Sequence, residues 1–156
     1  MRHIISVTVD NKPGVLARVS GLFSARGYNI ASLAVSETLD PTISCMTMVV
    51  EAEDERILEQ IKKQLNKLID VITVTDFTKK EHVERELVLL KINYSSKDKA
   101  KIESILDKYV AKIVSHEPDS AIVEAVGNQE QIKQLLSGLE QFGVKELVRT
   151  GRLAIA

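Results

Sequence analysis

The stretch DNKPGVLARVSGLFSARGYNI, residues 10–30, decides the fold, because it joins the end of a strand, a turn and a complete amphipathic helix. Asn11 is a favourable N-cap, Pro13 suits the first helical position, and Gly14 carries no side chain. The sequence therefore predicts bare backbone amides at a helix start, where the positive end of the helix dipole attracts anions such as carboxylates. A well-capped helix that binds no ligand is the other interpretation of these residues.

Both flanks of this turn show regular hydrophobic patterns. The preceding residues 3–9 alternate as in a strand with one buried face. The apolar residues that follow the turn recur at helical spacing and share one face. They are Val15, Leu16, Val19, Leu22 and Phe23. Gly27 is expected to end this helix.

The rest of the first half completes a strand and helix pattern. Residues 30–37 and 43–50 read as two antiparallel strands around the turn Leu39-Asp40-Pro41-Thr42. A helix over 54–68 and a strand over 71–77 follow. The charged segment that comes next lacks apolar periodicity, so we expect a first domain at 1–78 and a linker at 79–83.

The second half, 84–156, repeats this order and forms a second domain. Strands are expected over 84–94, 113–116, 121–126 and 144–149, with helices over 97–110 and 128–142. The fold class is therefore α+β, with two successive ferredoxin-like βαββαβ domains, each with both helices on one face of an antiparallel sheet.

The first sheet is expected to need a partner. Ile4 and the strands around Val35, Met46 and Met48 supply more apolar surface than two helices cover. An exposed edge with Thr47 to Val50 would also invite uncontrolled strand pairing. We therefore expect a homodimer that pairs through sheet faces or edges.

Composition excludes several classes of protein. The 21 Lys and Arg nearly balance the 22 Asp and Glu, so a basic nucleic-acid surface is not indicated. Cys45 is the single cysteine, which excludes an internal disulfide and suits a reducing compartment, so we expect a cytoplasmic protein. No apolar run approaches the roughly 20 residues of a membrane helix, so no membrane association is expected.

Catalytic and metal-binding patterns are not found in the sequence. His3, His82 and His116 lie far apart without metal-ligand spacing, and neither a phosphate-binding nor a dinucleotide-binding glycine motif occurs. RNA-recognition domains share this strand order, but they stack bases on aromatic residues of the central strands. RHIISVTVD and TISCMTMVV contain none, which disfavours RNA binding.

Four stretches carry a resemblance to a known family and together span essentially the whole chain. They are RHIISVTVDNKPGVLARVSGLFSARGYNIASL, DPTISCMTMVV, HVERELVLLKI and VRTG. The sequence resembles the small regulatory subunits of acetolactate synthase, also called acetohydroxyacid synthase, whose first half is an ACT domain. The family often has an arginine where this chain has Cys45, so this chain lacks that cation.

The resemblance implies a chain that is not an enzyme on its own. It would activate a separate catalytic subunit and confer feedback inhibition by valine on branched-chain amino-acid synthesis. The chain itself is expected to hold no cofactor, whereas thiamine diphosphate, Mg and FAD are expected in the catalytic large subunit. The alternative is an amino-acid-sensing ACT module without a synthase partner.

The resemblance also implies an effector site shared by two ACT domains in a homodimer or a larger assembly. It selects Asn11, Gly14, Val15 and Leu16 in the first loop, together with Asn29 and Ile30 of the neighbouring chain. Amides at Gly14 to Leu16 suit the carboxylate of valine, and an Asn side-chain oxygen suits its ammonium group. Asn29 also suits a turn after the helix.

Overall fold

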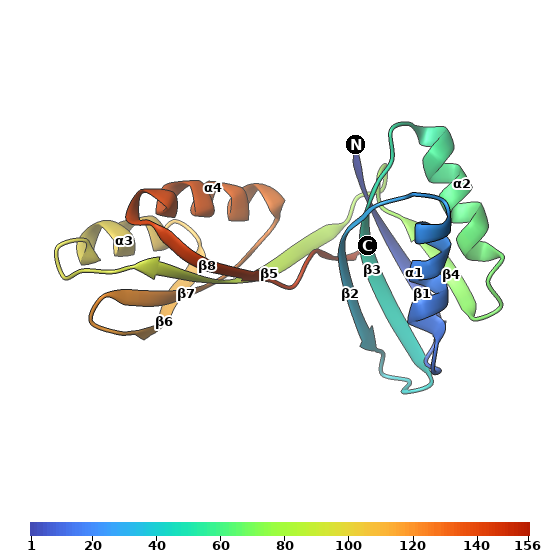
Figure 1. Cartoon of the computed structure of the whole chain (residues 1–156), viewed down its shortest axis with the longest axis horizontal. Coiled ribbons are helices and arrows are strands. Elements are labelled where there is room, and N and C mark those ends of the chain that lie inside the picture. Colours follow the sequence, from blue (N-terminus) through green and yellow to red (C-terminus); the bar gives the residue numbers. More distant parts are fainter. The chain divides into compact units, whose positions relative to one another are not determined.

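The computed structural model describes residues 1–156 and divides the chain into two compact units. The first unit comprises residues 1–83 and 151–156, and the second comprises residues 84–150. Each unit has the predicted βαββαβ order (Figure 1). The sequence placed 151–156 in the second domain, whereas these residues group with the first unit.

The first unit is a four-stranded antiparallel sheet with two helices on one face (Figure 1). The strand order is β2-β3-β1-β4, which places the first and third strands in the centre. The elements are β1 Arg2–Asp10, α1 Val15–Ala25, β2 Ile30–Glu37, β3 Ile43–Glu51, α2 Glu55–Asn66 and β4 Val71–Asp76.

Local side chains set several of these boundaries. Asp54 caps α2 by accepting hydrogen bonds from the amides of Arg56 and Ile57. In the β2–β3 turn, Oδ1 of Asp40 accepts from the amide and hydroxyl of Thr42 at 2.9 and 2.6 Å. Gly27 ends α1 at φ 67°, as the sequence predicted.

The start of α1 differs from the prediction. The helix begins at Val15, and Gly14 takes the N-cap position at φ 84° and ψ −8°. These angles are typical of the third residue of a type II turn, which Pro-Gly pairs favour. The amide of Val15 closes this turn on the carbonyl of Lys12 at 3.4 Å. The predictions of Asn11 as N-cap and of Pro13 as the first helical residue were therefore wrong, because the Pro-Gly turn precedes the helix, which begins only at Val15.

The expectation of uncovered apolar surface on the first sheet was wrong for Met46 and Met48, whereas Val35 is 42% exposed. Met46 lies opposite Val7 and Met48 opposite Ile5, so both methionines face the helices and are fully buried. On the opposite face, Ile4 and Val49 pack with Phe77 and with Ala154 near the C-terminus. This chain therefore covers the apolar end of that face itself.

The C-terminal segment follows the β8 strand and was not predicted as structure. It contains the short strand β9, Leu153–Ile155. Gly151 is buried at φ 83°, and a Cβ atom added there would lie 3.0 Å from Cβ of Ser32 on β2. A side chain larger than hydrogen would therefore push this segment away from β2.

The second unit is built on the same plan, with the order β6-β7-β5-β8 in its main sheet. Its core contains Val88, Leu90 and Ile92 of the central strand, packed against Ile102 and Leu135 of the two helices. The elements are β5 Val83–Asn93, α3 Lys99–Leu106, β6 Val110–His116, β7 Ser120–Gly127, α4 Gln129–Leu139, η1 Glu140–Phe142 and β8 Val144–Arg149.

The predicted helix over 97–110 was too long at both ends. The structure ends α3 at Leu106 and begins β6 at Val110. The amides of Lys108 and Tyr109 bond to the carbonyls of Ile105 and Leu106, which is the tight last turn of an ending helix. Val110 then pairs with Val126 of β7.

Candidate functional site

The first loop is held against the β2–β3 turn by Asn11. The backbone amide of Asn11 donates to the carbonyl of Thr42 at 2.7 Å, and Nδ2 donates to the carbonyl of Pro41 at 2.8 Å. The side-chain amide is therefore used to fix the loop. Asn11 positions the turn that carries Gly14.

Gly14 lies beneath a guanidinium group that the sequence did not indicate as part of the site. A Cβ atom added to Gly14 would lie 3.0 Å from Nη1 of Arg18. Nε and Nη2 of Arg18 each lie 2.8 Å from Oδ2 of Asp70, a buried residue, so the ion pair fixes the guanidinium. Its free edge, Nη1, faces the loop.

The electrostatics of this loop favour an anion. Nζ of Lys12 lies 2.8 Å from Oδ2 of Asp10, and this hydrogen bond raises the pKa of Lys12. No side chain caps α1, and its first turn contains no acidic residue. The uncapped start of α1 and Nη1 of Arg18 therefore lie beside Gly14, where the positive end of the helix dipole attracts anions.

The other two residues predicted in the loop face different ways. Val15 is 3% exposed and belongs to the core, so its side chain packs the helix against the sheet. Leu16 is 43% exposed beside it. Leu16 therefore offers an apolar surface at the same helix start as the amides.

Asn29 and Ile30 lie at the other end of α1, where β2 begins. Nδ2 of Asn29 donates to Oε2 of Glu51 at 2.9 Å, and Nε of Arg2 lies 3.2 Å from Oε1 of the same carboxylate. Ile30 packs against the core of the first unit. Asn29 and Glu51 line a hollow of about 530 Å³, together with Met1, Arg2, Gly27, Ala52 and Glu53.

The structure does not bring the two predicted groups together within one chain. The loop follows Asp10, at one end of β1, whereas Arg2 and its partner Glu51 lie at the other end. A strand of nine residues separates them, which corresponds to about 26 Å at about 3.3 Å per residue. A single small ligand therefore cannot touch Gly14 and Asn29 of the same chain.

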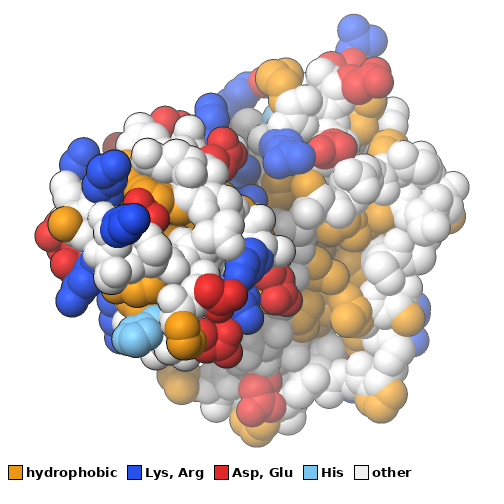
Figure 2. Space-filling view, turned by 60° about the vertical axis from the view of Figure 1, so that its left-hand side comes forward, with side chains coloured by type: hydrophobic (Ala, Val, Ile, Leu, Met, Phe, Trp, Pro, Cys, Tyr) orange, Lys and Arg blue, Asp and Glu red, His pale blue; other side chains and the backbone are white.

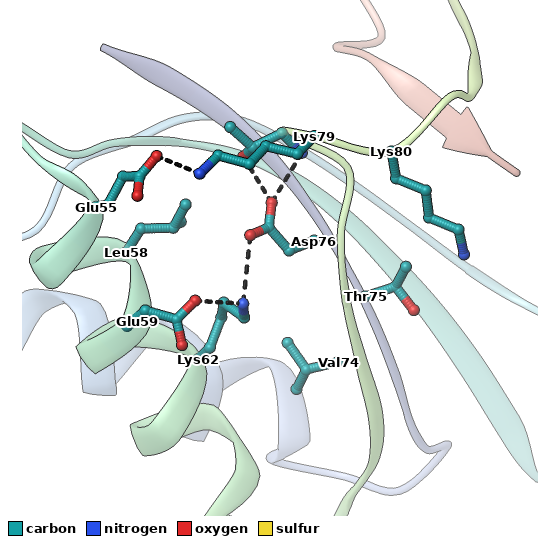
Figure 3. Close-up of a pocket in the computed structure, with 10 residues that line it drawn as sticks. Glu55, Leu58, Glu59, Lys62, Val74, Thr75, Asp76, Lys79 and Lys80 are labelled. Carbon is teal, nitrogen blue, oxygen red and sulfur yellow. Dashed lines mark hydrogen bonds and ion pairs between the residues drawn. The ribbon is translucent and has the colours of Figure 1, made fainter.

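A second hollow, of about 490 Å³, lies between α2 and β4 (Figure 3). Nζ of Lys62 lies 2.6 Å from Oε1 of Glu59 and 3.3 Å from Oδ2 of Asp76. Burial raises the pKa of Asp76, but hydrogen bonds from Thr78 and the contact with Lys62 outweigh this effect and lower it. Lys79 pairs with Glu55 at 2.6 Å. These charges bind one another and tie α2 to β4.

The histidines and the cysteine have structural contacts. Nδ1 of His3 lies 3.0 Å from Oγ1 of Thr78, His82 packs on Phe77, and His116 stacks on Tyr94. Sγ of the half-buried Cys45 lies 3.3 Å from Oγ of Ser6. The structure contains no group of three or more His, Cys, Asp or Glu residues placed to hold a metal ion.

The surface carries both signs of charge. Figure 2 shows Lys, Arg, Asp and Glu side chains interspersed on the face turned to the viewer, without a continuous basic area. This distribution is unlike the basic stripe that nucleic-acid-binding proteins present. No helix of the structure combines the length and apolar character needed to cross a bilayer.

Sequence reasoning missed Arg18, Asp70 and Glu51. Arg18 follows Gly14 by four residues, a spacing that places two helical positions on one face and that offered a usable signal. Asp70 and Glu51 reach the site through the pairing of distant strands. Their placement depends on strand register, which a hydrophobic pattern does not specify to the residue.

Comparisons with known proteins cover both units. Residues 5–73 match the family described as AHAS small subunit-like ACT domain, and residues 85–156 match the family described as small subunit of acetolactate synthase. The chain is 44% identical to a probable acetolactate synthase small subunit of Archaeoglobus fulgidus, over 99% of this chain and 96% of the relative. It is 42% identical to the acetolactate synthase small subunit of Bacillus subtilis, over 100% of this chain and 91% of the relative.

A solved structure agrees with these matches. The crystal structure of the acetolactate synthase small subunit from Thermotoga maritima is similar with a TM-score of 0.88 and 35% identity. The similarity covers 99% of this chain and 96% of that one. Both units and the C-terminal segment are therefore shared with that protein.

Proposed function

The chain belongs to the family of acetolactate synthase small subunits, and from this premise we propose that it regulates a separate catalytic subunit in response to valine. In this role the chain activates a thiamine-diphosphate-dependent synthase, and valine reverses the activation. The observation that carries the proposal is the anion-favouring loop at Gly14 inside an ACT domain.

The loop supports recognition of the carboxylate of an amino acid. The uncapped first turn of α1 begins directly after Gly14, and Nη1 of Arg18 lies 3.0 Å from the position of a Cβ atom added to Gly14. An amide cradle and a cation together form charge-assisted hydrogen bonds with a carboxylate. The exposed Leu16 lies at the same place and suits an aliphatic side chain.

The separation of the two predicted groups supports a site shared by two copies. Asn29 lies about 26 Å from the loop along β1, at about 3.3 Å per residue of this nine-residue strand, so it serves a ligand held by another chain. A two-fold dimer brings the same two surfaces together twice. Valine that binds between the copies then favours one dimer arrangement over another, which the catalytic subunit senses.

A reconstituted enzyme tests this function. Addition of this chain to the purified catalytic subunit of the same organism is expected to raise acetolactate formation at least about tenfold, and valine is expected to reverse the gain, because effector and subunit contacts are coupled. Acetolactate is measured at saturating pyruvate with and without valine. No gain on addition would overturn the proposed function, and a gain that valine leaves unchanged would overturn the effector assignment.

A further inference from the structure

The carboxylate of Glu51 lies beside Asn29 in the first unit and has no role in the site described so far. It lines the hollow there and is bound from two sides, by Nδ2 of Asn29 at 2.9 Å and by Nε of Arg2 at 3.2 Å. The amide of Glu51 also donates to the carbonyl of Asn29 at 3.0 Å. Glu51 and Asn29 are therefore joined through both backbone and side chain.

This contact fixes which way the Asn29 amide points. An ionised carboxylate only accepts hydrogen bonds, so Glu51 requires the NH₂ group of Asn29 on its side. The carbonyl oxygen Oδ1 is thereby turned away from Glu51 and is left as an acceptor. Asn29 and Glu51 together present oxygen acceptors and one negative charge to the hollow.

Glu51 stays ionised and retains capacity for a further donor. Hydrogen bonds from Asn29 and Arg2 lower the pKa of Glu51. A carboxylate has about four acceptor positions, and these two contacts leave others open. The Arg2 and Glu51 side chains are 58% and 42% exposed, and an ion pair this exposed is weak enough for a ligand to displace.

We propose that Glu51 is the residue that recognises the ammonium group of the effector, with Oδ1 of Asn29 as the second acceptor. The assignment rests on the proposed function and adds a specificity to it, since the site then accepts α-amino acids and rejects α-hydroxy acids of the same shape. The loop at Gly14 of the neighbouring copy holds the carboxylate. The ammonium group of the ligand is thus bound by a negative group of one chain, and its carboxylate by the positive loop of the other.

Calorimetric titration of the full-length protein with valine and with 2-hydroxy-3-methylbutanoate, which replaces the ammonium group by a hydroxyl, tests the assignment. The wild-type protein is expected to prefer valine, and Glu51→Gln is expected to lower that preference about fivefold or more, because the ammonium group would lose its ion pair and keep only a hydrogen bond to a neutral amide oxygen. Glu146→Gln is the matched control, because Glu146 is an exposed carboxylate of the second unit and does not line this hollow. This control is expected to keep the wild-type preference.

The outcomes separate this assignment from the function on which it rests. The Gln side chain still accepts from Asn29 through its oxygen, so a residue that only orients Asn29 would leave the preference unchanged in Glu51→Gln. That result, or an equal loss of affinity for both ligands, overturns the assignment alone. If the wild-type protein binds neither compound while folded, the effector function itself is overturned.

Discussion

Gly14→Asp is expected to abolish the response to valine at concentrations that saturate the wild-type protein. The new carboxylate would lie where the carboxylate of valine is proposed to bind, and like charges about 4 Å apart repel by about 4 kcal/mol at an effective dielectric constant of 20. Nη1 of Arg18, 3.0 Å from the position of the new Cβ, offsets part of this repulsion. We therefore expect affinity to fall at least about tenfold, which corresponds to about 1.4 kcal/mol.

Gly14→Asn is the control that separates charge from backbone strain. Gly14 has φ 84°, where a side chain costs about 1–2 kcal/mol, although Asn and Asp tolerate this region better than other residues. Both variants carry the same strain, and only Asp carries the charge. Calorimetric titration with valine is expected to show a larger loss for Asp than for Asn. Equal affinities in the two variants would contradict the carboxylate site at this loop.

Arg149→Ala is expected to lower the free energy of unfolding of the second unit by about 2–3 kcal/mol, because it leaves the carboxylate of Glu86 buried without its cation. Nε and Nη2 of Arg149 lie 2.8 and 2.7 Å from the two oxygens of Glu86, whose side chain is 4% exposed. The hydrogen bond to Glu86 also raises the pKa of Arg149. Removal of one partner of a fully buried pair costs about 3–5 kcal/mol of stability. Because the Arg149 side chain is 44% exposed, we expect a smaller loss here.

Urea denaturation with two further variants tests this value. Lys112→Ala removes one partner of an exposed pair, since Nζ of Lys112 lies 3.8 Å from Oε1 of Glu124, and is expected to change stability by less than about 0.5 kcal/mol. The double variant Glu86→Gln, Arg149→Met removes both charges and is expected to be more stable than Arg149→Ala. A loss in Arg149→Ala no larger than that in Lys112→Ala would show that the pair contributes nothing.

The sequence predicted the repeated βαββαβ order, since periodicity in these segments is strong and Gly27 and Asp40 mark turns with a clear physical cause. It misjudged the ends of elements where two local signals compete. Pro13 suits both a first helical turn and a type II turn, and only the closing bond from Val15 to Lys12 decides between them. Residues 151–156 group with the first unit through contacts to residues far away in the sequence, so no local pattern could predict this placement.

For the candidate site, the sequence indicated individual residues but not the charged groups beside them. Gly14 and Asn29 followed from the turn chemistry and the family resemblance, and each lies beside a charged group that supports its proposed role. The neighbouring charges themselves come from other elements. Asp70 precedes β4, and Glu51 ends β3, so their approach to the site is a product of strand pairing rather than of local sequence.

Each effector site is proposed to combine the loop of one chain with Asn29 of another. Mixed dimers of Gly14→Asp and Asn29→Ala chains, co-expressed with different affinity tags and purified through both, test it most directly. One of the two shared sites in such a dimer contains neither substitution, while the other contains both. Valine titration is expected to show half the wild-type number of sites at wild-type affinity, although each variant alone binds valine only weakly. A mixed dimer that binds no valine would contradict the shared site.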